Sequence, residues 1–391
     1  MNGFKRICSV LLGAVFFISG VLKLMDPLGT SLIVGEYYKF FHLGFLGFSS
    51  GVAGSLLALL ESVLGAALIT GVWRRVSAII SLCLIGLFTI VTAILWIARA
   101  PMDCGCFGEA LHLEHWQSFV KNLILGGLWC LAFLPLGNQG EPQKIKFVSF
   151  GTGAASVLLF GFYSMLSIPL VDFTSYKPGT ELSGAFGETF DDITAAVYTK
   201  DGREGAFTPD CPPDSSWTFV RYQSYGRGFS DESAPVQMLC FSDAAGEYAD
   251  SLALSGKVMI ISAYNPGKLS AGRLASIEDF AATASEKGYS TLYLVAGVPE
   301  TVDVGSPALA SCAYFADRRD LMTLNRSNGG ATFVSDGHIT AKWSAGALPS
   351  AEELDDLSGR DPVEYMMKRD NRGKVRLQGF LLYTFAVMLL L

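Results

Sequence analysis

The sequence predicts an integral membrane protein with two parts, an all-α helical bundle and an α/β domain outside the membrane. Apolar and aromatic residues make up 50% of the chain and charged residues only 17%, a balance unusual for a soluble protein. Long uncharged runs dominate the first part of the chain, whereas strand-length apolar runs separated by Gly, Asp, Ser and Pro follow Asp172. We therefore predict a four-helix unit, a fifth and a sixth span, and a separate α/β domain.

The membrane spans are predicted from apolar runs of about 18 to 25 residues, enough to cross a hydrocarbon core about 30 Å thick. They are Ile7–Leu24, Val52–Trp73, Val76–Ala98, Phe119–Leu136 and Phe147–Val171. A shorter run, Leu377–Leu391, is interpreted as a short anchor or an incomplete span. Lys5 and Arg6 precede the first run, but no small-residue cleavage site follows it, so we expect a retained helix and not a signal peptide.

Basic residues in the short loops predict the orientation of the spans. With a cytoplasmic N-terminus, the cytoplasmic loops hold Lys5, Arg6, Arg74, Arg75, Lys144 and Lys146. The opposite loops hold Asp26, Glu36, Asp103, Glu109 and Glu114. We therefore place the loop before Phe119 and the domain after Asp172 outside the cytoplasm. Basic residues before the last span oppose this orientation, but long translocated domains largely escape the rule.

The segment after Asp172 shows the pattern of a compact α/β domain. In its turn-rich first part, "TKDGREG" predicts a hairpin turn and "PDCPPDSSW" a loop. "VQMLCFSD" then predicts a short strand and a turn, and "GKVMIISAY" and "TLYLVAG" predict buried strands on either side of a helix at Ala271–Lys287. "ATFVSDGHITAKW" predicts a hairpin with Asp336 and Gly337 at its turn.

Over Val236–Leu354 this order resembles the thioredoxin-like fold. Redox-active members of that fold carry Cys-x-x-Cys at a strand-to-helix junction, where the helix N-terminus lowers the pKa of the attacking thiol. Here the junction reads "AYNPGKLSAG", and Ala331 stands where the fold places a proline before the last hairpin. We therefore expect this domain to bind a partner and not to carry out dithiol chemistry.

Three features of the N-terminal part resemble the MauE branch of the DoxX-like family. They are "FISGVLKLMDPLG" at the end of the first span, Glu61 within the second, and "DCGCFGEALHLEHWQSFVKN" leading into the fourth. The resemblance covers about residues 4 to 137, and DCGCFG is its most specific part. It implies a four-helix, multi-pass protein of the bacterial inner membrane that serves methylamine utilisation or a related pathway. It also implies a thioredoxin-like or disulfide-rich extracytoplasmic protein as partner.

Five segments follow from these patterns. They are 1–140, the MauE/DoxX-like membrane unit; 141–171, the fifth transmembrane helix; 172–235, a turn-rich linker; 236–354, the thioredoxin-like domain without Cys-x-x-Cys; and 355–391, a basic juxtamembrane segment with a C-terminal anchor. Partners should include the lipid bilayer but not nucleic acid, because the net charge is −7 and no basic patch is interleaved with aromatic residues. The sequence assigns no cofactor.

Cys104 and Cys106, separated only by Gly105, are the candidate redox pair. When oxidised, thiols one residue apart close a small strained ring, and strain raises the reduction potential. Gly105 supplies the backbone freedom that such a ring needs. Because the outer face of a bacterial membrane is oxidising, the pair would cycle only with a dedicated partner.

Two other interpretations of this loop remain open. The cysteines can be small buried residues of a tight turn, with no chemistry. Alternatively, Cys104, Cys106, His112 and His115 offer two thiolates and two imidazoles, a set that suits copper(I) or zinc, although the spacing matches no zinc motif.

Glu61 is the candidate proton-transferring or hydrogen-bonding group within the membrane. An ionised carboxylate at mid-span costs at least a few kcal/mol unless it is paired or protonated. We therefore expect Glu61 to face the bundle interior, with Lys23 as a candidate partner. The aromatic stretch "EYYKFFHLGFLGF" is too broken to span and is predicted to lie in the interface, anchored by Tyr37 and Tyr38.

The remaining cysteines divide by location. Cys8, Cys83 and Cys130 fall within predicted spans and are interpreted as small apolar packing residues. Cys211, Cys240 and Cys312 fall in the outer part, an odd number that predicts one disulfide and one free thiol. Of these, Cys240 is expected to stay unpaired.

Two classes of function are consistent with the sequence. In the first, the chain assists thiol–disulfide exchange or maturation of extracytoplasmic clients through Cys104 and Cys106. In the second, it is a non-catalytic membrane adaptor whose outer domain binds a partner. A protein that handles metal through the Cys/His set is a further alternative.

Overall fold

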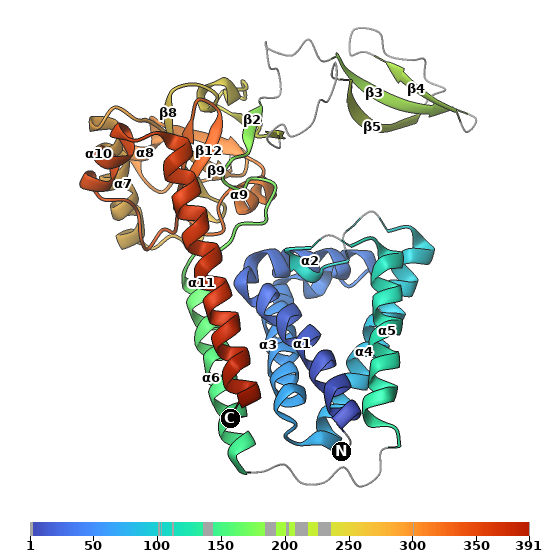
Figure 1. Cartoon of the computed structure of the whole chain (residues 1–391). Coiled ribbons are helices and arrows are strands. Elements are labelled where there is room, and N and C mark those ends of the chain that lie inside the picture. The colour runs from blue at the N-terminus through green and yellow to red at the C-terminus, as the bar shows by residue number, and fades with distance from the viewer. Residues whose placement is uncertain are drawn as a thin grey trace.

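The computed structural model describes the chain in two regions, an N-terminal bundle of helices and a separate α/β region (Figure 1). It describes residues 3–100, 102, 104–111, 113–135, 144–183, 193–200, 203–207, 218–225, 236–299 and 301–390. In Figure 1 the two ends of the chain lie at the same end of the bundle, far from the α/β region.

The bundle consists of helices, several of which follow the predicted apolar runs to within a few residues. They are α1 (Gly3–Met25), α2 (Pro27–Phe40), η1 (Gly44–Ser49), α3 (Ser50–Thr70), α4 (Arg74–Ala98), α5 (His115–Phe133), α6 (Lys144–Leu166) and α11 (Pro362–Leu390). Among the described residues, five helices are long and apolar enough to cross a membrane: α1, η1 with α3, α4, α6 and α11. The predicted fourth span, α5, is a helix of 19 residues that is not one of these five.

Helices α1 and α3 approach each other closely because glycines line their contact. A Cβ atom on Gly65 would collide with the backbone of Phe17, and one on Gly20 would collide with the backbone of Ser62. Small residues permit this close packing where lipid supplies no hydrophobic drive between helices.

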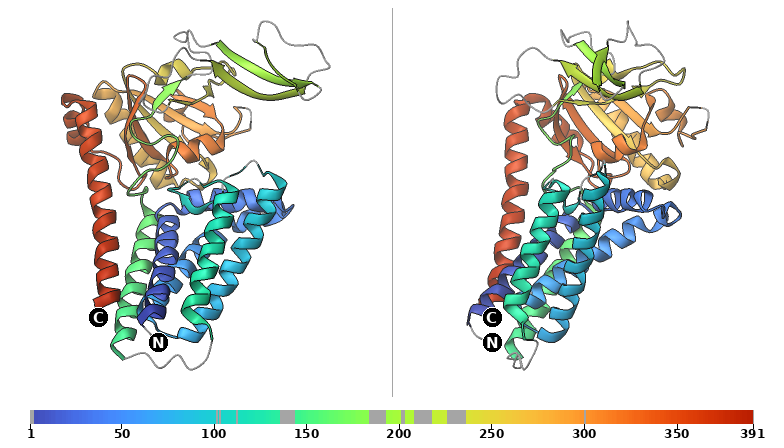
Figure 2. Two further views of the ribbon diagram at one scale, coloured as in Figure 1. Left: turned by 45° about the vertical axis from the view of Figure 1, so that its right-hand side comes forward. Right: turned by 90° about the vertical axis from the view of Figure 1, so that its right-hand side faces the viewer.

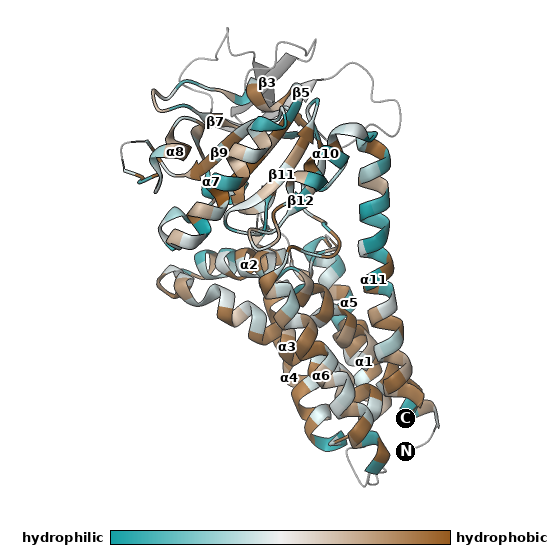
Figure 3. Cartoon of the chain, turned by 90° about the vertical axis from the view of Figure 1, so that its left-hand side faces the viewer, coloured by the Kyte–Doolittle hydropathy of each residue, from teal (hydrophilic) through white to brown (hydrophobic). Residues whose placement is uncertain are grey.

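Helices α6 and α11 pack against each other and run in opposite directions beside the bundle (Figure 1). The rings of Phe160 and Phe380 stack between them with centroids 4.6 Å apart. Helix α6 ends at Leu166 and not at the predicted Val171, since Pro169 disfavours helical backbone at the residue before it. The predicted anchor is the apolar half of α11, whose first half is hydrophilic and lies beside the α/β region (Figure 3).

The α/β region is built on an eight-stranded sheet with the order β6-β2-β12-β11-β8-β9-β10-β7. Its strands are β2 (Glu181–Ser183), β6 (Val236–Met238), β7 (Phe241–Ser242), β8 (Lys257–Ala263), β9 (Ser290–Ala296), β10 (Ala313–Ala316), β11 (Gly330–Ser335) and β12 (His338–Trp343). Strands β8, β9 and β10 are parallel, whereas β11 is antiparallel to both β8 and β12. The strands predicted from "GKVMIISAY" and "TLYLVAG" and the hairpin at Asp336 are confirmed.

Helices cover both faces of this sheet, because its central strands are apolar on both faces. Helices α7 (Ala271–Glu286) and α10 (Ala351–Gly359) contribute to the core on one face, together with the short α8 (Pro307–Ala310). Helix α9 (Arg318–Leu324) packs on the other face. Two 3₁₀ turns, η2 (Asp250–Ala253) and η3 (Pro266–Lys268), complete this region.

The segment predicted to be a turn-rich linker contributes more structure than expected. Strand β2 extends the large sheet, and Tyr176 is buried in its core. Further along, β3 (Ile193–Lys200), β4 (Arg203–Phe207) and β5 (Thr218–Tyr225) form a small antiparallel sheet (Figure 2). The β3–β4 pairing confirms the hairpin predicted from "TKDGREG", whereas "PDCPPDSSW" lies outside the described residues.

Candidate functional site

The loop between α4 and α5 brings Cys104 and Cys106 together. Their sulfur atoms are 3.2 Å apart, compared with about 2.05 Å in a disulfide, so they are not bonded to each other and lie within hydrogen-bonding distance. Gly105 has φ +59°, and a side chain there would also collide with Ile33. The tight turn therefore requires glycine between the two cysteines. Cys106 begins the short strand β1 (Cys106–Glu109).

The surroundings make the two sulfurs chemically different. The Cys104 thiol donates to Cys106, and this bond, helped by the nearby Lys121 ammonium, lowers the pKa of Cys106 to about 5 although burial opposes it. The same bond, together with burial, raises the pKa of Cys104, which keeps the proton. Thiolates, not thiols, attack disulfides. The direction of these shifts favours the thiolate at Cys106, whereas Cys104 is the more buried thiol of the pair.

Glu61 faces the bundle interior, as predicted, and its partner is Lys23. The Lys23 ammonium lies 2.6 Å from one carboxylate oxygen of Glu61 and 2.8 Å from the other, and Glu61 is 0% exposed. Lys23 lies near the end of α1, but helical side chains lean toward the N-terminus, which brings its ammonium back to the depth of Glu61.

Ser19 links this ion pair to the cysteine loop. Its hydroxyl oxygen is 2.7 Å from Glu61 Oε2 and also 2.7 Å from the backbone oxygen of Cys106. Tyr37, on α2, donates to the backbone oxygen of Cys104. The loop is thereby held from two sides, and Tyr37 has a role beyond the interfacial anchoring that the sequence suggested.

A cavity of about 300 Å³ lies beneath the cysteine loop. Its polar lining includes Cys104, Cys106, Lys23 and Glu61. Lys121 and Asn122 of α5 also line it. Its remaining walls are mainly apolar, and they include Phe16, Phe41, Leu57, Ile85, Phe88, Val91 and Leu125. The bundle therefore surrounds the thiol pair with an apolar space that has polar groups at one side.

Sequence reasoning did not single out Lys121 and Asn122. The Lys121 ammonium lies 4.9 Å from the centre of the Phe107 ring, within cation–π range. Asn122 is buried, and its amide donates to Thr92 over 3.3 Å. Both occur close to an apolar run, in "HWQSFVKN", and polar side chains within a span are themselves a signal of function.

The alternative metal set is not assembled by the described residues. His112 lies outside them, and the His115 ring nitrogen Nε2 is 3.0 Å from the backbone oxygen of Ala100. Within the described ranges, no three His, Cys, Asp or Glu side chains converge as metal ligands. The four-residue Cys/His site stays a prediction, because one of its members is not described.

The other cysteines fit their predicted roles unevenly. Cys8 is buried in the bundle, whereas Cys83 and Cys130 are exposed on its outer surface. A small apolar side chain on a membrane helix can face lipid as readily as it packs, which is why the packing role fails for those two. Cys240 and Cys312 are both free, and Cys211 lies outside the described residues.

The strand-to-helix junction of the α/β region has an amide clamp and no thiol. The Asn265 backbone N–H donates to Asn328 Oδ1 over 2.9 Å, and the Asn328 amide donates back to the Asn265 backbone oxygen over 2.8 Å. Ala331 is fully buried in β11. This end of the region can hold its own backbone in place, but it contains no group for dithiol exchange.

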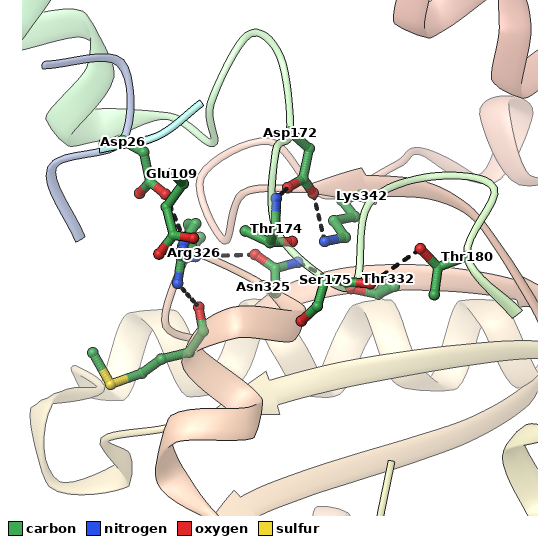
Figure 4. A network of polar contacts seen from close by, with 12 residues as sticks. Asp26, Glu109, Asp172, Thr174, Ser175, Thr180, Asn325, Arg326, Thr332 and Lys342 are labelled. Carbon is green, nitrogen blue, oxygen red and sulfur yellow. Dashed lines mark hydrogen bonds and ion pairs between the residues drawn. The ribbon is translucent and has the colours of Figure 1, made fainter. Parts of the chain in front are cut away.

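One arginine of the α/β region joins it to the bundle (Figure 4). Arg326 Nε is 2.9 Å from Asp26 Oδ2, and Arg326 Nη2 is 3.2 Å from Glu109 Oε1. Asp26 caps α2 by accepting a hydrogen bond from Gly29, and Glu109 ends β1. The arginine side chain, only 5% exposed, therefore holds both the helix and the strand that flank the cysteine loop.

A second buried ion pair lies close by, between Lys342 and Asp172 at 2.6 Å (Figure 4). It ties β12 to the segment that leaves α6. The Lys342 ammonium holds the pKa of Asp172 below its usual range, although burial alone would raise it. Arg319 pairs with Glu36 of α2 in a more exposed setting, where an ion pair contributes little.

An apolar bundle with a buried Lys–Glu pair and a close dithiol, joined to an α/β region, defines a multi-pass membrane protein with an appended domain. Residues 1–135 match the family model described as methylamine utilisation protein MauE. The match bears out, for this part of the chain, the resemblance to a family of membrane proteins that its motifs suggested. No curated protein and no solved structure matches the chain.

Proposed function

We propose that the chain is an inner-membrane protein of methylamine utilisation or a related pathway that exchanges disulfides with an extracytoplasmic client through Cys104 and Cys106. The observation that carries this proposal is the thiol pair itself. Its sulfurs are 3.2 Å apart, and the pKa of Cys106 is lowered to about 5 while that of Cys104 is raised. The match of residues 1–135 to the MauE family model supports the membrane setting and the pathway.

The proposed exchange uses the two cysteines in sequence. The Cys106 thiolate attacks one sulfur of a client disulfide, a mixed disulfide forms, and the first client sulfur leaves as a thiolate. Cys104 then loses its proton and attacks Cys106, so that the Cys104–Cys106 disulfide forms and the second client sulfur leaves. The reverse sequence oxidises a client dithiol, which the strain of the small ring favours.

The proposed topology has a cytoplasmic N-terminus and an extracytoplasmic α/β domain. The Lys and Arg distribution of the short loops supports it. The contact between Arg326 and Glu109 further supports a common side for the cysteine loop and the α/β domain, because Glu109 follows the loop directly.

The test uses the purified full chain and oxidised glutathione. Cys104→Ser should form a stable, reducible adduct with one glutathione, since Cys106 remains a thiolate and nothing resolves the mixed disulfide. Cys106→Ser should react far more slowly, since Cys104 is buried, and burial both limits access to its sulfur and raises its pKa. The double Ser variant gives the baseline from the other cysteines. A Cys104→Ser adduct no greater than that baseline would exclude exchange at this loop.

A second candidate function is a non-catalytic adaptor. It is favoured by the junction at Asn265, which holds an amide clamp where a thioredoxin-like domain with redox activity has its dithiol. In this case the α/β domain binds a partner and the cysteine loop is structural. Double replacement of Cys104 and Cys106 by Ser would then leave growth on methylamine unchanged in a host that depends on the chain. Loss of growth would favour thiol exchange.

A further inference from the structure

We propose that the cavity beneath the cysteine loop binds a lipid-soluble quinone, which accepts the two electrons released when Cys104 and Cys106 form a disulfide. This inference rests on the proposed thiol-exchange function and adds the class of its electron acceptor. The observation that carries it is that one apolar cavity contains both cysteines and a set of polar groups, all within the bundle.

The size and lining of the cavity suit the head group of a quinone. Its volume of about 300 Å³ lies at the lower end of the range typical of small-molecule sites, which are mostly apolar with a few polar groups. Aromatic and aliphatic side chains from several helices form the walls, among them Phe41, Phe88 and Leu125. A flat ring with an apolar tail can occupy such a space, whereas a charged, water-soluble carrier would lose its hydration there.

The cavity also has a border that a ligand dissolved in lipid could cross. Leu43 and Leu87 line it, yet they are 38% and 52% exposed on the outside of the molecule. Leu87 belongs to α4, one of the helices apolar enough to span a membrane. In a membrane, a ligand that enters beside Leu87 would come from the lipid and would not pass through water.

The polar side of the cavity offers donors for the two carbonyl oxygens of a quinone. Asn122 is only 1% exposed, and its amide group, which has two N–H bonds, makes one hydrogen bond, to Thr92. The second N–H is free to donate to a ligand. The Lys121 ammonium beside Cys106 stabilises negative charge at the same place, as the reduction of a carbonyl requires.

The oxidation of Cys104 and Cys106 by a quinone is balanced in electrons and protons. The Cys106 thiolate attacks the quinone, and Cys104 then attacks Cys106 so that the sulfur–sulfur bond forms. Two electrons pass to the ring, which leaves as a quinol with one proton from the Cys104 thiol and one from solvent. The strained disulfide that remains is ready to oxidise a client dithiol.

The experiment measures quinol formation by the reduced, purified full chain, without oxygen and with decylubiquinone as acceptor. Wild-type protein should yield one quinol for each Cys104–Cys106 pair oxidised in a single turnover. Val91→Trp, which fills the cavity from α4, should slow the reaction by about tenfold or more, equivalent to about 1.4 kcal/mol. Ile90→Trp is the matched control, because Ile90 is the neighbouring residue and is 61% exposed on the outer face.

Two further measurements separate the possible failures. Glutathione adduct formation in a Cys104→Ser background should be the same with and without Val91→Trp, which shows that the loop is intact. An azido-substituted quinone should label cavity residues on illumination, and decylubiquinone should compete with it. Labelling spread over the outer face, or labelling of the cavity without competition, would mean that lipid acyl chains fill it and would overturn the proposal.

The outcomes distinguish this inference from the function on which it rests. A wild-type protein whose Cys104→Ser form binds glutathione but which yields no quinol would overturn the quinone proposal alone. Equal rates of quinol formation by Val91→Trp and Ile90→Trp would do the same. If Cys106 reacts with neither glutathione nor decylubiquinone, the exchange function and the quinone inference both fail.

Discussion

At the scale of single residues, the surroundings shift the pKa values of two cysteine thiols in opposite directions. Cys104 and Cys106 are separated by one glycine, yet one donates a hydrogen bond and the other accepts it. The Lys121 ammonium, which lies beside Cys106, further favours the thiolate there. The sequence could identify the pair, but not this difference, because it does not show that the loop places Cys106 beside Lys121 of α5.

Alkylation of Cys106 should therefore depend on pH in an unusual way. With a pKa of about 5, its reaction rate with iodoacetamide should reach a plateau near pH 6, whereas an ordinary cysteine reacts faster up to about pH 8.5. Lys121→Met should move the midpoint upward, because the thiolate loses a nearby positive charge. Lys146→Met, at the other end of the bundle, is the control. Mass spectrometry of the Cys106 peptide gives the rate, and a wild-type midpoint near 8.5 would refute the assignment.

At the scale of elements, the close approach of α1 and α3 is held by both glycines and charges. Much of this scale could be predicted: α1, α3, α4, β8, β9 and the β11–β12 hairpin all follow local patterns of apolar residues. Strand β2 and the cavity could not be predicted, because they depend on contacts between distant segments. The Lys23–Glu61 pair was only a candidate, since two residues of different helices give no local signal of their relative depth.

Replacing one member of the Lys23–Glu61 pair should destabilise the bundle more than replacing both. Lys23→Met or Glu61→Leu each leaves a buried charge unpaired, at a cost of about 3–5 kcal/mol. The double variant buries no charge and should recover most of that loss. Urea unfolding of the chain in detergent, followed by circular dichroism, gives the free energies. Additive losses in the double variant would show that the two side chains do not act as a pair.

At the scale of the whole molecule, Arg326 joins the α/β region to both elements that flank the cysteine loop. Its two acidic partners come from positions far away in the sequence, Asp26 and Glu109. The family motifs include both acidic residues, but their partner lies beyond the part of the chain that the family model matches. Sequence patterns could predict two regions, but not how one is held on the other.

Replacing Arg326 by Met should loosen the α/β region from the bundle without unfolding either. Asp26 and Glu109 would lose their shared partner, so hydrogen exchange should become faster in the backbone of α2 and β1, while β8 and β9 stay protected. Arg360→Met is the control, because its ion pair with Asp356 is exposed and local, at the C-terminal end of α10. Unchanged exchange in α2 and β1 would show that other contacts hold the two regions together.

The α/β region is anchored twice, since its chain enters from α6 and leaves through α11, and these two helices pack side by side (Figure 2). A domain attached in this way cannot diffuse from the surface it touches. Its effective concentration at the cysteine loop is on the order of millimolar, as for a short linker. Any other protein that binds the bundle surface beside the cysteine loop must therefore compete with the α/β region. A weakly binding partner at low concentration would reach the cysteine loop only when the α/β region separates from it. The frequency of that separation would then set the rate of binding.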